Sequence, residues 1–273
     1  MGSNLDTPII GIDRGATFTD FAIVESGRLK ETFSLEDRSW AAIQSAYTRL
    51  KTKYQTDHCV FSGCATGMPA AIQERINIIA EIDAIGFGGS ALANRSSCVV
   101  VSMGTGSAVV HFSQNIAKHA GGSGVGGGTI KGLASLICGL EDPLQLDALA
   151  MQGSASNLNL TISDLGYEEI SFLGADMTAS NFASVKSKKT EDLAAGILRL
   201  VGETVGIIAS ICARELNCSE NIVLVGKVAQ SLYIRQILNL VGKLYQTRFH
   251  YPANPGFATV YGAALKYRYD QKK

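Results

Sequence analysis

Apolar residues occur along this chain in short runs separated by polar turns, and their spacing predicts alternating strands and helices. Residues 8–13 read PIIGID, a short apolar strand that ends in a carboxylate. The following FTDFAIVESGRLKETFSL alternates enough to predict two more strands joined by a turn at Ser26 and Gly27. A helix is predicted over 39–53 with Ser39 as its N-cap, then a strand in CVFSG and a largely helical stretch over 69–92.

The second half repeats part of this pattern. CVVVSMGTGSAVVHF, which begins at Cys98, predicts two apolar strands around a Gly-Thr-Gly turn, as IIGIDRGATFTDFAIV does in the first half. Two like lobes that present such turns to a shared cleft would bring both turns to one polyanionic ligand. The later predicted elements are helices over 129–140 and 142–153, a long helix over 191–216, a buried strand over 221–226, a helix over 229–243, a strand over 245–251 and a closing helix in PGFATVYGAALKY.

Composition narrows the class of protein. The 273 residues are 46% hydrophobic and 18% charged, with 24 basic and 24 acidic side chains. This balance provides no overall field for nucleic acid or an anionic membrane, so neither partner is expected. The six cysteines form no CxxC pair, and MGSNLDTP is too short and polar for a signal peptide. Free thiols in a cytoplasmic protein are therefore expected, without a metal cluster or disulfide framework.

Residues 193–213 are apolar enough to resemble a membrane span, but Arg199 and Glu203 stand four apart on one helical face. We expect a buried helix at a core or a subunit interface. The polar stretch 153–175 receives no role from the sequence.

Six of the eight residues over 121–128 are glycine. No Walker loop fits here, and the GxGxxG match at Gly122, Gly124 and Gly127 follows polar residues that predict no buried strand. Glycines nevertheless allow successive N–H groups to converge on an anion, and a helix predicted to begin near Thr129 would add its dipole. A tight loop without a ligand is the plain alternative. The neighbouring motifs GIDRGATFTD and MGTGS, each after a strand, favour phosphate binding.

The pattern GID-x-G-x-T at 11–17 resembles the first phosphate motif of the actin, Hsp70 and sugar-kinase superfamily. Within it, the chain resembles type II pantothenate kinases. The stretches that carry this resemblance are AEIDA (80–84), VSMGTGS (101–107), GGSGVGGGTIKGL (121–133), DMTASNF (176–182), the helix over 193–215 and NIVLVG (221–226). The resemblance implies an α/β, two-lobed, actin-like (ribonuclease H-like) ATPase or kinase fold with a nucleotide cleft between the lobes. The lobes would span 1–95 and 96–255, with a helix over 256–273 packing back on the first.

The resemblance also implies an activity: phosphorylation of pantothenate, or of pantetheine, by ATP and Mg²⁺ in coenzyme A biosynthesis, by a cytoplasmic homodimer that pairs through helix 191–216. Asp13 would hold Mg²⁺ through water, and Glu81 would be the catalytic general base. The substrate would contact Glu81, Thr105, Ser107 and His119. The nucleotide and its phosphates would contact Asp13, Gly15, Thr17, Gly104, Thr105, Gly106, Gly122, Gly124, Gly126, Gly127, Gly128 and Gly226.

Three positions depart from the family pattern. Ala16 and Asp20 replace a glycine and a lysine of the first motif, and His119 replaces an arginine before the glycine loop. An imidazole cannot copy a guanidinium fork, and in a strand the adjacent Lys118 would point to the opposite face. These departures keep two alternatives open. One is a kinase of the same fold for another small alcohol, such as a sugar or amino sugar, and the other is a nucleotide-binding reactivase or regulatory ATPase.

Overall fold

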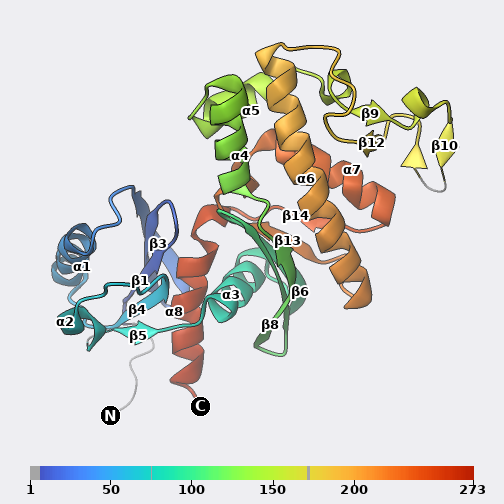
Figure 1. Cartoon of the computed structure of the whole chain (residues 1–273). Helices are drawn as coiled ribbons and strands as arrows, with labels where there is room; N and C mark the ends of the chain where they lie inside the picture. Colours follow the sequence, from blue (N-terminus) through green and yellow to red (C-terminus); the bar gives the residue numbers. More distant parts are fainter. Residues whose placement is uncertain (1–6, 75, 171–172) are drawn as a thin grey trace.

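The computed structural model describes residues 7–74, 76–170 and 173–273, and two five-stranded sheets organise them (Figure 1). The first sheet has the order β3-β2-β1-β4-β5 and the second the order β14-β13-β6-β7-β8. In the first sheet the strands are β1 (Ile9–Arg14), β2 (Thr19–Glu25), β3 (Arg28–Leu35), β4 (Cys59–Gly63) and β5 (Asn77–Ile78). In the second they are β6 (Ser97–Met103), β7 (Ser107–Ser113), β8 (Ile116–Ser123), β13 (Ile222–Val225) and β14 (Phe249–His250).

The two sheets share one topology. Each begins with three antiparallel strands, β1-β2-β3 or β6-β7-β8, and each adds two parallel strands beside the first of these. The strand–turn–strand repeat seen in the sequence is therefore a repeat of whole sheets. Because β1 and β6 occupy equivalent central positions, the turns that follow them leave equivalent edges of their sheets.

Helices cover both faces of each sheet. Helix α1 (Trp40–Tyr54) packs on one face of the first sheet and α8 (Ala258–Asp270) on the other. Helix α3 (Glu81–Ala93) covers one face of the second sheet, and α6 (Thr190–Glu215) with α7 (Leu232–Tyr245) covers the other. Since α3 also packs along α8, these two helices form the layer between the sheets (Figure 1). The lobe boundaries predicted at 95 and 255 stay a prediction.

Several local predictions are confirmed and one is wrong. The Ser39 hydroxyl accepts the Ala42 N–H at 3.2 Å and caps α1, as expected from serine before an amphipathic run. The stretch 69–92 is not one helix, because it contains α2 (Ala70–Gln73), the strand β5 and only then α3. Its β-branched run pairs with β4, with Val60 opposite Asn77, and completes the edge of the sheet.

Differences in the second half are smaller. The predicted helix over 129–140 begins earlier, as α4 (Gly127–Leu133), and continues as a π-helical turn, η1 (Ala134–Cys138). It is followed by α5 (Pro143–Ala150), whose N-cap Asp142 accepts the Leu144 N–H. The predicted helix over 229–243 is divided into a 3₁₀ turn, η4 (Lys227–Gln230), and α7.

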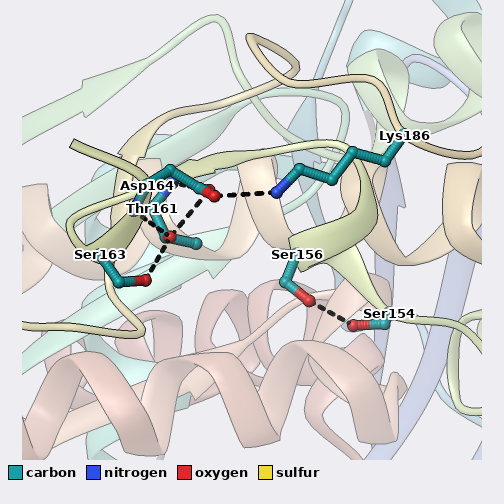
Figure 2. A network of polar contacts seen from close by, with 6 residues as sticks. All are labelled: Ser154, Ser156, Thr161, Ser163, Asp164 and Lys186. Carbon is teal, nitrogen blue, oxygen red and sulfur yellow. Dashed lines mark hydrogen bonds and ion pairs between the residues drawn. The ribbon is translucent and has the colours of Figure 1, made fainter. Parts of the chain in front are cut away.

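The stretch over 153–175, which has no predicted role, and the DMTASNF segment after it form short elements at one end of the second lobe. They are η2 (Ala155–Asn157), β9 (Leu160–Thr161), η3 (Ser163–Leu165), β10 (Glu169–Ile170), β11 (Leu173–Gly174) and β12 (Thr178–Ser180). Asp164 accepts hydrogen bonds from the N–H and hydroxyl of Thr161 and pairs with Lys186 at 2.9 Å (Figure 2). These contacts lower the pKa of Asp164 to about 2. Polar side-chain bonds thus fix the turn around Asp164.

Helix α6 is long and apolar enough to span a membrane by length and composition, but 56% of its most apolar window is buried inside the protein. Arg199 and Glu203 pair with each other at 2.8 Å, and Glu203 also accepts the hydroxyl hydrogen of Thr178. Burial against the second sheet and α7 accounts for much of the apolar surface of α6. Its part in a subunit interface stays a prediction.

Candidate active site

Asp13 lies near the end of the central strand β1, beside its neighbours on both sides. It stands opposite Asp20 of β2 and Ser62 of β4, so the three side chains share one face of the sheet. A Cβ atom on Gly63 would lie 2.8 Å from Asp13 Oδ1, and Gly63 has a φ of +87°. The missing side chain at Gly63 therefore makes room for the Asp13 carboxylate.

Burial, and after it the negative charges of Asp20 and Glu81, raise the pKa of Asp13 to about 7 against the opposing positive charge of Lys227. The cause is physical: a carboxylate removed from water and placed among like charges holds its proton more tightly. A bound cation would reverse that preference. Asp13, Asp20 and Glu81 thus form one acidic region, although they come from two strands and a helix.

These residues fit a magnesium ion that keeps most of its water. In the described part of the chain, no group of three or more His, Cys, Asp and Glu side chains is placed to hold a metal. Mg²⁺ commonly binds through one or two carboxylates, retained waters and substrate phosphates, which needs no such group. The Ser62 hydroxyl is buried without a hydrogen-bond partner among the described residues. It could therefore donate a hydrogen bond to a metal-bound water beside Asp13.

Asp20 does not leave an uncompensated negative charge at the phosphate motif. Its side chain is 11% exposed, and its Oδ1 atom lies 2.8 Å from the ammonium of Lys227. The Ser34 hydroxyl donates to the same oxygen at 2.5 Å. The charge reversal at this motif position is therefore offset by a lysine that lies 207 residues later in the chain.

The first phosphate turn is tight and exposed at its tip. Gly15 donates its N–H to the carbonyl of Phe18 at 2.9 Å, while Ala16 and Thr17 are exposed. Arg14 lies over the ring of Trp40, with 4.7 Å between the guanidinium carbon and the ring centroid. Its guanidinium also donates to the carbonyls of Arg38, Cys64 and Thr66.

The sequence did not predict that Arg14 orders the loops around this turn. The only signal is a charged residue inside a glycine motif, and it does not reveal which carbonyls lie nearby. The loop after β4 and the loop before α1 thus meet at one guanidinium, next to the turn that carries Thr17.

The second predicted phosphate turn, which is the Gly-Thr-Gly turn at Gly104–Gly106, contacts the glycine loop over 121–128 directly. Gly127 donates its N–H to the carbonyl of Gly104 at 2.7 Å, and Gly128 donates to the carbonyl of Thr105 at 2.8 Å. A Cβ atom on Gly126 would lie 2.5 Å from the oxygen of Gly106. The two segments predicted to meet at the phosphates are therefore adjacent, and glycine is required because their backbones touch.

The N–H groups at the start of α4 are used inside the protein. The N–H of Gly126 donates to the Thr129 hydroxyl, so three successive N–H groups at the start of α4 bond within the protein. Gly121 and Gly122 belong to β8, and Gly124 has no atom near its Cβ position. Phosphate binding by the turn and the loop stays a prediction. In this structure the helix start supplies close packing rather than free donors.

Gly226 fixes the end of β13 against the second phosphate turn. Its φ is +91°, and a Cβ atom there would lie 2.4 Å from the Met103 oxygen. Its N–H donates to the carbonyl of Pro255 at 2.8 Å. The turn at Gly226, predicted to contact the nucleotide, therefore joins the ends of β6 and β13, and it places Lys227 toward the first lobe.

Glu81 is the first residue of α3, and its side chain is exposed. A carboxylate in the first turn of a helix interacts favourably with the positive end of the helix dipole. Its negative charge lies close enough to Asp13 to contribute to the raised pKa of that carboxyl group. The helix that covers the second sheet therefore begins beside the acidic region of the first.

His119 lies on the α3 side of β8. It pairs with Val110, which packs under α3, and a Cβ atom on Gly86 of α3 would lie 2.6 Å from the Ala117 side chain two residues earlier. Lys118 pairs with His111 and points to the other face, as expected for a strand. Lys118 therefore cannot substitute for the side chain at His119.

A register shift follows His119. Val110 pairs with His119 but Val109 pairs with Gly121, so Ala120 has no residue opposite it in β7 and forms a β-bulge. Beyond the bulge, Gly121 faces Cys212 of α6 rather than α3. Ser107, predicted at the substrate, lies across from Ser123 with 3.3 Å between their hydroxyl oxygens.

Comparison with known proteins gives a consistent assignment. The profile of the family described as Fumble matches residues 90–247. A type II pantothenate kinase from Oceanobacillus iheyensis is 28% identical over 271 residues, which cover 94% of this chain and 98% of that protein. The similarity therefore extends over both lobes.

Solved structures share the fold at lower identity. The activator of the 2-hydroxyisocaproyl-CoA dehydratase from Clostridium difficile, with bound ADPNP, has a TM-score of 0.67 and 17% identity over 97% of this chain and 95% of that chain. A ROK family glucokinase from Streptomyces griseus, with glucose and AMPPNP, has a TM-score of 0.61 and 14% identity over 94% and 98%. These likenesses confirm the predicted two-lobed, actin-like α/β fold.

Proposed function

The chain belongs to the Fumble family, and from this membership we propose that it is a type II pantothenate kinase, a phosphotransferase with an alcohol acceptor. The observation that carries the proposal is the similarity to a pantothenate kinase over 94% of the chain, together with an acidic region at Asp13 and Glu81. Fold neighbours that contain ADPNP or AMPPNP support ATP as the phosphoryl donor.

The arrangement supports a direct transfer. The primary hydroxyl oxygen of pantothenate attacks the γ-phosphorus of ATP, the bond from that phosphorus to the β–γ bridging oxygen breaks, and ADP leaves. Glu81, exposed at the start of α3, accepts the hydroxyl proton. Asp13 would hold the hydrated Mg²⁺ that accompanies ATP, and the ion would offset the negative charge of the phosphates. The turn at Gly104–Gly106, which is held by hydrogen bonds from the glycine loop, lies against the phosphoryl group during its transfer.

Further parts of the proposal concern the setting of the enzyme. We assign it to the cytoplasm, because its thiols are free among the described residues and its relatives are bacterial metabolic enzymes. It forms a homodimer in which α6 supplies contact surface. Ile211 on α6 is 55% exposed in the single chain, which leaves apolar area for a partner.

Another small alcohol is the second candidate acceptor. His119 faces α3 at the position where the family pattern has arginine, so the predicted substrate end of the cleft offers a shorter side chain without a guanidinium fork. A sugar or amino sugar would need hydrogen bonds there rather than a guanidinium to hold a carboxylate. A regulatory ATPase is the third reading, and the fold shared with the dehydratase activator supports only its nucleotide binding.

The test measures ATP consumption by purified protein with Mg²⁺ and pantothenate, pantetheine, a panel of sugars, or no acceptor. Turnover with pantothenate that is lost in Glu81→Gln supports the proposal. Turnover only with a sugar would move the assignment to the second candidate. Acceptor-independent hydrolysis that Glu81→Gln leaves intact would favour the regulatory ATPase.

A further inference from the structure

The ion pair between Asp20 and Lys227 joins the two lobes. Asp20 lies on β2 of the first sheet, and Lys227 begins the 3₁₀ turn that follows β13 of the second. The ammonium lies 2.8 Å from Asp20 Oδ1 and donates to the Ser34 hydroxyl at 2.6 Å. Because Ser34 also donates to Asp20, the three groups form a closed triangle.

Both ends of this pair are anchored. The lysine follows Gly226, whose backbone is pressed against Met103 and bonded to Pro255. The aspartate stands directly opposite Asp13 in the β1–β2 pairing. A shift of one lobe relative to the other would therefore separate the ammonium from the carboxylate, since neither backbone is free to follow.

The surroundings make the pair stronger than a surface ion pair. The Asp20 side chain is 11% exposed, and the Lys227 ammonium lies 4.3 Å from the ring centroid of Phe18 and 5.5 Å from that of Phe257. Aromatic faces attract a cation and exclude water around it. Breaking the pair leaves a largely buried carboxylate without its cation, which is costly in a folded protein.

We propose that Lys227 is a positioning residue for phosphoryl transfer, which with Asp20 and Ser34 forms a latch that fixes the separation of the lobes. The latch holds the acidic region of Asp13 and Glu81 against the second-lobe turn at Gly104–Gly106. Lys227 acts through Asp20 and the strand that carries it, not by contact with the reacting atoms. This role in catalysis rests on the proposed kinase activity, whereas the latch itself does not.

The test is a charge-reversal cycle with Asp20→Lys, Lys227→Asp and the double variant. Each single reversal places two like charges together and should lower kcat about tenfold or more, with a smaller change in the KM for ATP. The double variant restores the opposite charges and should recover at least threefold over either single variant. Lys53→Met is the matched control, because Lys53 pairs with Glu31 at 2.6 Å within the first lobe, and its kcat should stay within twofold of wild type.

A second readout needs no substrate. Small-angle scattering of the nucleotide-free protein should give a larger radius of gyration for Lys227→Met than for wild type or for Lys53→Met. Equal radii, or a double variant no more active than the single variants, would overturn the latch. If wild type fails to phosphorylate pantothenate while the radii differ as expected, the proposed substrate is wrong and the latch stands.

Discussion

Gly88 of α3 and Gly262 of α8 meet backbone to backbone between the two sheets. A Cβ atom on Gly262 would lie 2.4 Å from the Gly88 nitrogen, and one on Gly88 would lie 3.2 Å from the Gly262 nitrogen. The same added atoms would lie 1.9 Å from the carbonyl oxygens of Ala84 and Ala258. The layer between the lobes is therefore as thin as two helices allow, and a methyl group cannot enter without moving one of them.

Gly262→Ala should lower the free energy of unfolding by about 3 kcal/mol, because the helices must separate to admit the methyl group. The matched control is Gly132→Ala in α4, where no atom lies within 4 Å of the Cβ position. There the replacement should raise stability by up to about 1 kcal/mol through helix propensity. Urea unfolding followed by circular dichroism measures both, and equal effects would contradict the close crossing.

Glu81→Gln should lower kcat about 10²-fold or more and leave ATP affinity nearly unchanged, because the amide keeps the shape of the side chain but cannot accept a proton. Asp83→Asn, in the same first turn of α3, is the control for a lost charge at the helix start. Steady-state kinetics with pantothenate should show Asp83→Asn within about threefold of wild type. A kcat for Glu81→Gln equal to that of the control would remove Glu81 from the role of base.

The raised pKa of Asp13 makes the stability of the metal-free protein depend on pH. The folded protein holds the Asp13 proton up to a pKa of about 7, against 3.8 for an ordinary aspartate. The stabilising contribution is therefore full below about pH 4 and is lost as the pH rises through 7. Asp13→Asn should be more stable than wild type at pH 8, by at most about 4 kcal/mol, and no more stable at pH 4.

Urea unfolding in the presence of a chelator, at pH 4 and pH 8, checks this difference. Added Mg²⁺ should stabilise wild type more at pH 8 than at pH 6, since the cation and the proton compete for one carboxylate. A stability difference between Asp13→Asn and wild type that did not change with pH would contradict the shifted pKa.

His119→Arg should lower the KM for pantothenate about tenfold, because a guanidinium can bind a carboxylate with two charge-assisted hydrogen bonds. Lys118→Arg is the matched control, since that side chain points to the opposite face of β8. Initial rates at varied pantothenate would show no change for the control. A higher KM for His119→Arg would place the substrate carboxylate elsewhere.

Local signals in the sequence accounted for much of the fold. Ser39 before an amphipathic run marked the start of α1, and the repeated strand–turn–strand motif marked the two sheets. The error over 69–92 arose because a β-branched run completes a sheet edge in the folded chain, and periodicity does not record that partner. Helices and strands were thus predicted correctly where the local preference of a segment agreed with its packing in the folded chain.

For the candidate site, the sequence indicated residues but not the contacts between them. The glycine loop was located from its composition, but its N–H groups bond to Gly104 and Thr105, which no spacing rule reveals. Asp20 looked like a reversed charge because its partner, Lys227, lies 207 residues away. Contacts of this length depend on how the lobes close, so they become visible only in three dimensions.

The unpaired Ala120 divides β8 into two stretches that can evolve separately. Before the bulge, the pairing of His119 with Val110 decides which face of the sheet each side chain occupies. After the bulge, the pairing with Val109 decides it. A substitution upstream can therefore change the side chain that faces α3 without disturbing the backbone that leads into the glycine loop. In a lineage that acquires a new acceptor, we expect changes to accumulate upstream of the bulge while the glycines downstream persist.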